Sequence, residues 1–186
     1  MVAALMLSAT AIGCGTPEPA APPPAGPGPA AESLDIGPAA EDTVGGWLPD
    51  DATLSPFDVS HPIVGWLDPA LLDALQQAAQ AAQRDGVDLR ITSGWRSRGF
   101  QQRLLDAAVR TYGSPDAARE FVATPDQSRH VDGQAVDIAP VEADHWLIAN
   151  GARFGLCQVF ANEIWHFELV ADDGQCPPLK PNAATS

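Results

Sequence analysis

The composition of the chain changes abruptly near Gly45, and this change limits where a fold can form. Residues 15–45 consist largely of Pro, Ala and Gly with acidic side chains, and they contain almost no large apolar residue. Such a segment cannot bury enough apolar surface to offset the conformational entropy lost on ordering. We therefore expect an extended, semi-rigid linker here. One folded domain is expected over residues 46–180, followed by a flexible tail over residues 181–186.

The first residues, MVAALMLSATAIGC, form a short apolar run that ends in small residues and a cysteine. The run is too short to span a bilayer and is typical of the hydrophobic part of an export signal. Ala11-Ile12-Gly13-Cys14 resembles the bacterial lipoprotein signal, although no Lys or Arg precedes the apolar run. The resemblance predicts a signal peptide over residues 1–13, and lipidation of Cys14 at the start of a linker over residues 14–45. The domain would then lie outside the cytoplasm, anchored to the membrane by lipid alone. An ordinary cleaved signal with an incidental cysteine is the alternative.

Charge and cysteine content narrow the class of protein further. The formal net charge of −14 disfavours nucleic acid as a partner. With Cys14 assigned to a lipid, Cys157 and Cys176 remain, and an even pair outside the cytoplasm most often forms a disulfide. Zinc ligation by this pair is the alternative, but two isolated cysteines make a poor zinc pattern. No sequence feature indicates an oligomer, so a monomer is expected by default.

Capping residues and apolar patterns divide the domain into helices and short strands. A helix is predicted to begin at Pro69 after the N-cap Asp68 and to end at Gly86. Further helices are predicted over residues 98–112, from Ser114-Pro115, and over residues 141–149. Strands are predicted within residues 87–93, 134–138, 154–160 and 164–170. Helices that precede a small sheet indicate an α+β fold, a single domain in which a small, mostly antiparallel sheet packs with helices.

Three stretches carry unusual polar side chains: TSGWRSRGFQ (92–101), SRHVDGQAVDI (128–138) and NEIWHFEL (162–169). A catalytic zinc typically has three protein ligands and an open position for water. Two imidazoles and one carboxylate are a normal set for this role, and they would come from His130, Asp137 and His166.

Two further residues would complete such a centre. Glu163, three residues before His166, is the candidate general base. Arg96, at the end of a predicted strand, could bind a substrate carboxylate or a developing oxyanion. Each residue also has an ordinary structural explanation, since a single His is more often structural, Asp137 can cap a turn, and Glu163 and Arg96 can be surface charges. Only the joint pattern separates the two interpretations.

Together, the three stretches resemble the zinc D-Ala-D-Ala carboxypeptidase and dipeptidase family, which includes vancomycin-resistance enzymes of the VanY type. The family motif Ser-x-His-x-x-Gly-x-Ala-x-Asp is matched at Ser128, His130, Gly133, Ala135 and Asp137. The motif Glu-x-Trp-His is matched at Glu163, Trp165 and His166, and the motif Ser-Gly-aromatic-Arg is matched at Ser93, Gly94, Trp95 and Arg96. The resemblance covers roughly residues 67–169. Asp132 departs from it, because relatives often carry Thr there.

The resemblance implies that His130, Asp137 and His166 bind Zn²⁺ at one side of the sheet. It implies that Glu163 is the catalytic base and that Arg96 stabilises the substrate and the transition state.

Substrate contacts are implied for Ser128 and Gln101. The expected activity is hydrolysis of the terminal D-Ala of peptidoglycan stem peptides by a zinc-activated water. Relatives with the same zinc site cut L-Ala-D-Glu or cross-link bonds, so a peptidoglycan endopeptidase is one alternative. A non-catalytic, zinc-containing module that binds the cell wall is the other.

Overall fold

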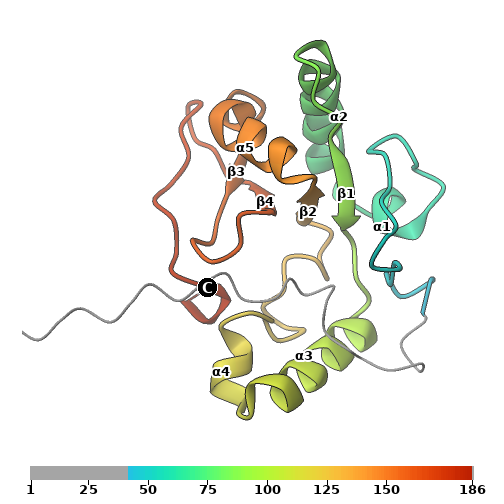
Figure 1. Cartoon of the computed structure of the whole chain (residues 1–186), viewed down its shortest axis with the longest axis vertical. Helices are drawn as coiled ribbons and strands as arrows, with labels where there is room; N and C mark the ends of the chain where they lie inside the picture. Colours follow the sequence, from blue (N-terminus) through green and yellow to red (C-terminus); the bar gives the residue numbers. More distant parts are fainter. Residues whose placement is uncertain (1–41, 186) are drawn as a thin grey trace, which may run out of the picture.

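The computed structural model describes residues 42–185 (Figure 1). The predicted signal peptide, Cys14 and most of the predicted linker lie outside the described residues. Within the described part, none of the helices has the length and apolar character that crossing a membrane requires.

Helices and a single small sheet make up the described chain. In chain order the elements are α1 (Pro62–Gly65), α2 (Pro69–Arg84), β1 (Arg90–Ser93), α3 (Arg98–Tyr112), α4 (Pro115–Arg119), β2 (Ala135–Ala139), α5 (Val141–Asn150), the 3-10 helix η3 (Gly151–Phe154), β3 (Leu156–Gln158), β4 (His166–Leu169) and the 3-10 helix η4 (Ala183–Thr185). The strands form one antiparallel sheet in the order β1-β2-β4-β3. The predicted α+β class, with a small antiparallel sheet, is confirmed.

Local hydrogen bonds set the limits of the longer helices. The Asp68 side chain accepts a hydrogen bond from the Ala70 N–H at 2.8 Å and so caps α2. Ser97 caps α3 in the same way, and α3 ends at Gly113, whose φ of 80° suits glycine. These limits agree with the sequence prediction because caps depend only on residues within one turn.

Several elements differ from the prediction. Strand β3 covers only the middle of the strand predicted over residues 154–160, because Gly151–Phe154 form η3. β1 is shorter than the predicted strand, because the Val87 N–H still donates to the Ala82 carbonyl at 2.9 Å and closes the end of α2. The single turn α1 was not predicted from the sequence. The His61 ring caps it by accepting a hydrogen bond from the Ile63 N–H.

Side chains on β2 and β4 alternate between two faces of the sheet. Val136, Ile138 and Phe167 are buried in the main core, where α2 and α5 pack against the sheet (Figure 1). Successive residues of a strand point to opposite faces. Asp137 and His166 therefore lie on the face opposite to α2 and α5, and the sheet register pairs them directly.

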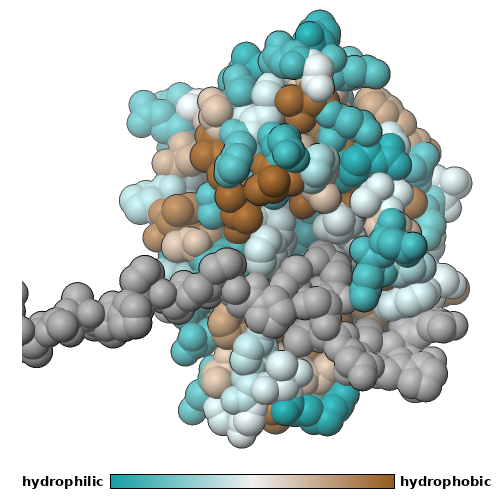
Figure 2. Space-filling view, viewed as in Figure 1, coloured by the Kyte–Doolittle hydropathy of each residue, from teal (hydrophilic) through white to brown (hydrophobic). Residues whose placement is uncertain are grey.

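Helices α3 and α4 pack around a second apolar cluster at the lower end of the molecule in Figure 1. On the face seen in Figure 2, hydrophilic side chains predominate, and hydrophobic ones gather mainly in the upper half, where α5 and the sheet lie. The exposed large apolar residues of α5 are Val141 and Ile148. The sheet face that carries Asp137 is turned towards helices α3 and α4, so a site can form between the sheet and these helices.

The folded part begins earlier than the predicted boundary. The Gly45 carbonyl accepts a hydrogen bond from the Ser97 N–H at 2.8 Å, and Asp42 forms an ion pair with Arg103 at 3.0 Å. Residues 42–45, which were expected in the linker, therefore pack against the start and middle of α3.

The C-terminal end also differs from the expected flexible tail. The predicted disulfide between Cys157 and Cys176 is present and ties this end to β3. Ala183 lies in η4 and is buried against Val159 and Phe160. Ala183 can pack here because the disulfide at Cys176 and the backbone hydrogen bonds of Lys180 hold this segment beside the sheet.

Candidate metal centre

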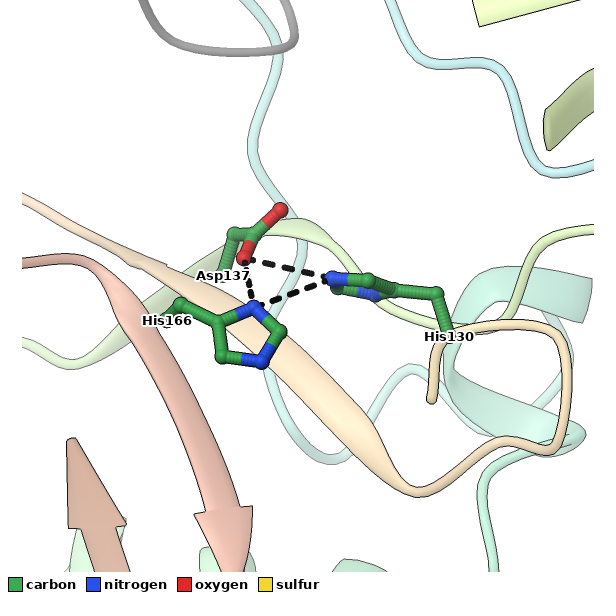
Figure 3. Close-up of side chains that lie close together, drawn as sticks. All are labelled: His130, Asp137 and His166. Carbon is green, nitrogen blue, oxygen red and sulfur yellow. Dashed lines mark hydrogen bonds and ion pairs between the residues drawn. The ribbon is translucent and has the colours of Figure 1, made fainter. Parts of the chain in front are cut away.

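Three side chains converge on one point beside the sheet (Figure 3). Nε2 of His130 lies 3.3 Å from Nδ1 of His166 and 3.4 Å from Oδ1 of Asp137, and the His166 and Asp137 atoms are 3.2 Å apart. All three residues are buried. Zinc at about 2.0–2.1 Å from tetrahedral ligands holds them about 3.3–3.4 Å apart. The predicted ligands therefore have the separations that such an ion requires.

Each imidazole is oriented by the ring nitrogen that faces away from this cluster. The Nδ1–H of His130 donates to the Gly94 carbonyl at 2.8 Å, and the Nε2–H of His166 donates to Oε1 of Glu168 at 3.1 Å. Metal-binding imidazoles are commonly fixed by such remote hydrogen bonds. The nitrogens that face the cluster can then offer their lone pairs to a metal.

Glycine permits the backbone approaches that position His130. Gly133 has a φ of 69°, and a Cβ atom there would lie 2.5 Å from the Trp66 carbonyl oxygen. At Gly94, a Cβ atom would lie 2.5 Å from the Ile63 carbonyl oxygen. The tight turn expected at Gly133 is therefore present, and Gly94 allows its own carbonyl to reach His130.

Arg96 is held on the side of Asp137 that faces away from the histidines. Its Nη2 donates to Oδ2 of Asp137 at 2.8 Å, its Nε to the Ser93 hydroxyl at 2.8 Å, and its Nη1 to the Gln101 side-chain oxygen at 3.3 Å. The Gln101 amide nitrogen donates in turn to the Ala123 carbonyl at 2.9 Å. Arg96 thus orients a predicted ligand, and Gln101 positions Arg96. Substrate contact by Gln101 stays a prediction.

Burial, hydrogen bonding and neighbouring charges determine which side chains of the cluster are ionised. Burial and the Arg96 charge lower the pKa of His130. Burial opposes ionisation of Asp137, but the neighbouring His130, His166 and Arg96 side chains hold its pKa well below the usual range. Burial alone would lower the pKa of His166, yet hydrogen bonds to Asp137 and Glu168 raise it to about 10. Without a metal, a proton therefore resides on His166, between two carboxylates.

Glu163 lies next to the cluster, on the turn before β4. Its Oε2 is 3.8 Å from Nδ1 of His166, the nitrogen that faces the other ligands. A general base must reach the proton it abstracts directly or through one water. The predicted base is therefore close enough to act on a water molecule at the cluster.

Glu168 was not among the site residues predicted from the sequence. Its carboxylate is buried beside His166, and its second oxygen lies 3.7 Å from the Arg129 side chain. Burial raises the pKa of Glu168, but the hydrogen bond with His166 and the charges of His166 and Arg129 together lower it overall. One signal could have revealed this residue, since position i+2 of a strand shares a face with the ligand at position i.

A cavity of about 380 Å³ lies beside the cluster. It is lined by every predicted metal, catalytic and substrate-binding side chain, namely Arg96, Gln101, Ser128, His130, Asp137, Glu163 and His166. The buried Ser128 hydroxyl has no hydrogen-bond partner among residues 42–185. The cavity therefore has a polar end at the cluster, with a hydroxyl available to a ligand.

Residues 65–172 match the family model described as VanY, D-alanyl-D-alanine carboxypeptidase. The chain belongs to the VanY family of D-alanyl-D-alanine carboxypeptidases. The matched range contains all the predicted metal, catalytic and substrate-binding residues, and it ends before the C-terminal segment.

Among VanY relatives, the chain is similar to a D-alanyl-D-alanine carboxypeptidase of Enterococcus faecalis. The two are 33% identical over 121 residues, which cover 52% of this chain and 45% of that protein. The chain thus spans about half the length of this curated relative.

Two solved structures of VanY proteins resemble the chain in fold and sequence. One is a mutant of the vancomycin-resistance D,D-pentapeptidase VanY from a VanB-type cassette, in complex with Zn(II), with a TM-score of 0.54 and 29% identity over 58% of this chain and 75% of that one. The other is VanYB in complex with D-alanine-D-alanine, with a TM-score of 0.53 and 32% identity over 56% of this chain and 71% of that one. Both likenesses support the α+β fold described above.

Proposed function

We propose that this domain is a zinc-dependent carboxypeptidase that hydrolyses the terminal D-Ala of peptidoglycan stem peptides outside the cytoplasm. The observation that carries the proposal is the cluster of His130, Asp137 and His166, whose ligand atoms have tetrahedral separations beside Glu163. The Zn(II) and D-alanine-D-alanine named for the two solved relatives support the choice of metal and substrate.

His130, Asp137 and His166 would hold the zinc ion. When bound, zinc supplies a Lewis acid that polarises a carbonyl group and lowers the pKa of water. Within the described part, no fourth His, Cys, Asp or Glu belongs to the cluster. Three protein ligands favour a catalytic centre over a closed structural one, which argues against a non-catalytic wall-binding module.

The other cavity residues have distinct roles in this proposal. Glu163 takes a proton from the attacking water and passes it to the departing amine. Arg96 keeps Asp137 ionised and in place, and its charge stabilises the negative charge that develops on the substrate oxygen. The Ser128 hydroxyl donates a hydrogen bond to the peptide.

The test is D-alanine release from an N-acylated Lys-D-Ala-D-Ala peptide by a soluble form of the chain that begins at residue 15. We expect release that stops with a chelator and returns with zinc, and that is lost in Glu163→Gln at unchanged zinc content. Release that survives the chelator would contradict the metal mechanism. A zinc-loaded protein that leaves this peptide intact but cuts whole wall peptides would indicate an endopeptidase, which uses the same centre on another bond.

We also propose that Cys14 carries a lipid and that the following linker holds the domain at the membrane. The support is the export-signal pattern that ends at Cys14 and the Pro- and Ala-rich composition that follows. In bacterial cells, Cys14→Ala should move the full chain from the membrane fraction to the soluble fraction, whereas Cys176→Ala should not. Equal fractionation of Cys14→Ala and the natural chain would reject the anchor.

A further inference from the structure

The segment from residue 175 to residue 185, here called the C-terminal strap, forms part of the cavity wall. It begins after the family match, which ends at residue 172. Lys180 and Ala183 of the strap line the cavity together with Phe160, Glu163 and His166. In Figure 1 the strap runs from the sheet towards α4, and η4 contacts that helix. This chain therefore adds a wall to the cavity with residues that the family match does not include.

The strap is fixed at several points along its length. Cys176 is covalently bonded to Cys157 of β3. The Lys180 N–H donates to the Val159 carbonyl at 2.9 Å, and the Lys180 carbonyl accepts from the Ala161 N–H at 2.8 Å. The backbone of Lys180 is thus held on both sides, so the fold fixes the point from which its side chain extends to the cavity.

Three Arg and Lys side chains line the cavity, and two of them face carboxylates. Arg96 is bonded to Asp137 at 2.8 Å, and Arg129 lies 3.7 Å from Glu168. No carboxylate between residues 42 and 185 forms an ion pair with Lys180. Its ammonium group is therefore the lining cation whose charge remains available to a ligand.

One aromatic ring separates this ammonium group from the predicted metal ligands. The Lys180 Nζ lies 6.0 Å from the centre of the Phe160 ring, and that ring centre lies 5.0 Å from the centre of the His166 ring. One residue of an extended peptide spans about 3.3–3.6 Å. A substrate group that contacts Lys180 would thus lie within a few residues of the peptide bond that is cleaved at the metal.

We infer that Lys180 is a substrate-binding residue that receives a carboxylate of the peptide. The inference rests on the proposed function and names the substrate chemistry that this chain selects. A carboxylate needs a counter-charge here, because Asp137, Glu163 and Glu168 line the same cavity and the chain carries a net charge of −14. A lysine ammonium group meets a carboxylate as a compact point charge with three donors.

The carboxylate can come from two places in the peptide, and two probes separate them. N-acyl-Lys-D-Ala-D-Ala carries only its terminal carboxylate. The same peptide extended by a γ-linked D-Glu on the acyl side carries a second one. For each probe, KM and kcat are measured by D-alanine release, and the Kd is measured by calorimetry in a zinc-loaded Glu163→Gln background.

The variant is Lys180→Met, which keeps an aliphatic stem and removes the charge. We expect KM and Kd to rise about tenfold, with kcat within twofold, because a hydrogen bond to a charged group is lost. Lys180→Arg should restore most of the affinity. Arg110→Met, which removes an exposed charge outside the cavity, controls for the change in net charge. A rise for both probes assigns the terminal carboxylate, and a rise for the extended probe alone assigns the acyl-side one.

KM and Kd that stay within twofold for both probes in Lys180→Met overturn the inference. The Kd measurement in the Glu163→Gln background separates this result from failure of the proposed function. If the natural chain hydrolyses neither probe but binds one in a Lys180-dependent manner, the proposed activity fails and the inference stands. Absence of both hydrolysis and binding overturns both.

Discussion

The Glu168 carboxylate accepts a hydrogen bond from the Nε2–H of His166 at 3.1 Å, and the two residues are separated by a single position in β4. Residues two apart on a strand share a face of the sheet, so the strand alone brings these two side chains together. It places the other ring nitrogen, Nδ1, towards Asp137 and His130. Glu168 therefore acts on the metal centre by orienting His166.

We predict that Glu168→Ala weakens zinc binding about 10- to 100-fold, as expected when the outer partner of a metal-binding imidazole is lost. Competition with a chromophoric chelator measures the effect. Glu168→Gln retains an acceptor and should recover most of the affinity. Glu142→Ala removes an exposed carboxylate on α5 and serves as the matched control. A zinc Kd within twofold of the natural value in Glu168→Ala would reject the positioning role.

Zinc binding should release about one proton per site at neutral pH, because a ligating imidazole must be neutral. In the metal-free protein, hydrogen bonds to two carboxylates raise the pKa of His166 to about 10, so its proton is still bound at pH 7. The apparent zinc affinity should then increase as the pH rises towards 10. Calorimetric titrations in two buffers of different ionisation enthalpy give the number of protons. Equal heats in both buffers would show that no proton is released.

The same raised pKa affects the stability of the metal-free domain. A histidine whose pKa is raised by folding contributes stability that is fully present below its unfolded value of about 6.5 and is lost as the pH rises through the folded value. Thermal melts of the metal-free domain should therefore show a falling melting temperature between pH 7 and pH 10, and His166→Asn should reduce this slope. An identical slope in the variant would exclude His166 as its source.

Arg96→Met should lower kcat about 100-fold or more, because a preorganised donor to developing charge is removed. The change also leaves Oδ2 of Asp137 without its 2.8 Å partner, so zinc content must be measured beside activity. Gln101→Ala, which removes the side chain that receives Nη1 of Arg96, should have a smaller effect in the same direction. Full activity in Arg96→Met at full zinc occupancy would remove Arg96 from the mechanism.

The Cys157–Cys176 disulfide should stabilise the domain by about 3 kcal/mol, the size expected for a closed loop of this length. The double variant Cys157→Ser, Cys176→Ser tests this by denaturant unfolding. Because the disulfide anchors the strap that carries Lys180, we also expect KM to rise more than kcat falls. A double variant that loses stability with unchanged KM would show that the strap keeps its place without the covalent link.

Local signals in the sequence predicted those parts of the fold that depend on neighbouring residues. Asp68 with Pro69, and Ser97 with Gly113, marked the limits of α2 and α3 because capping hydrogen bonds span a single turn. By contrast, β1 is shorter than predicted. The alternating apolar pattern could not reveal that Val87 is still bonded to the end of α2.

The sequence by itself determined which chemical groups the candidate centre can use, since the three motifs contain two imidazoles, two carboxylates and an arginine. The tertiary structure alone decided how these groups meet. Asp137 and His166 are neighbours because β2 and β4 pair in one register, and Arg96 reaches Asp137 because β1 adjoins β2. The placement of Lys180 on the cavity wall likewise follows from a disulfide and two backbone hydrogen bonds. Such contacts join residues far apart in the chain, and local sequence patterns carry no record of strand register or of what packs across a cavity.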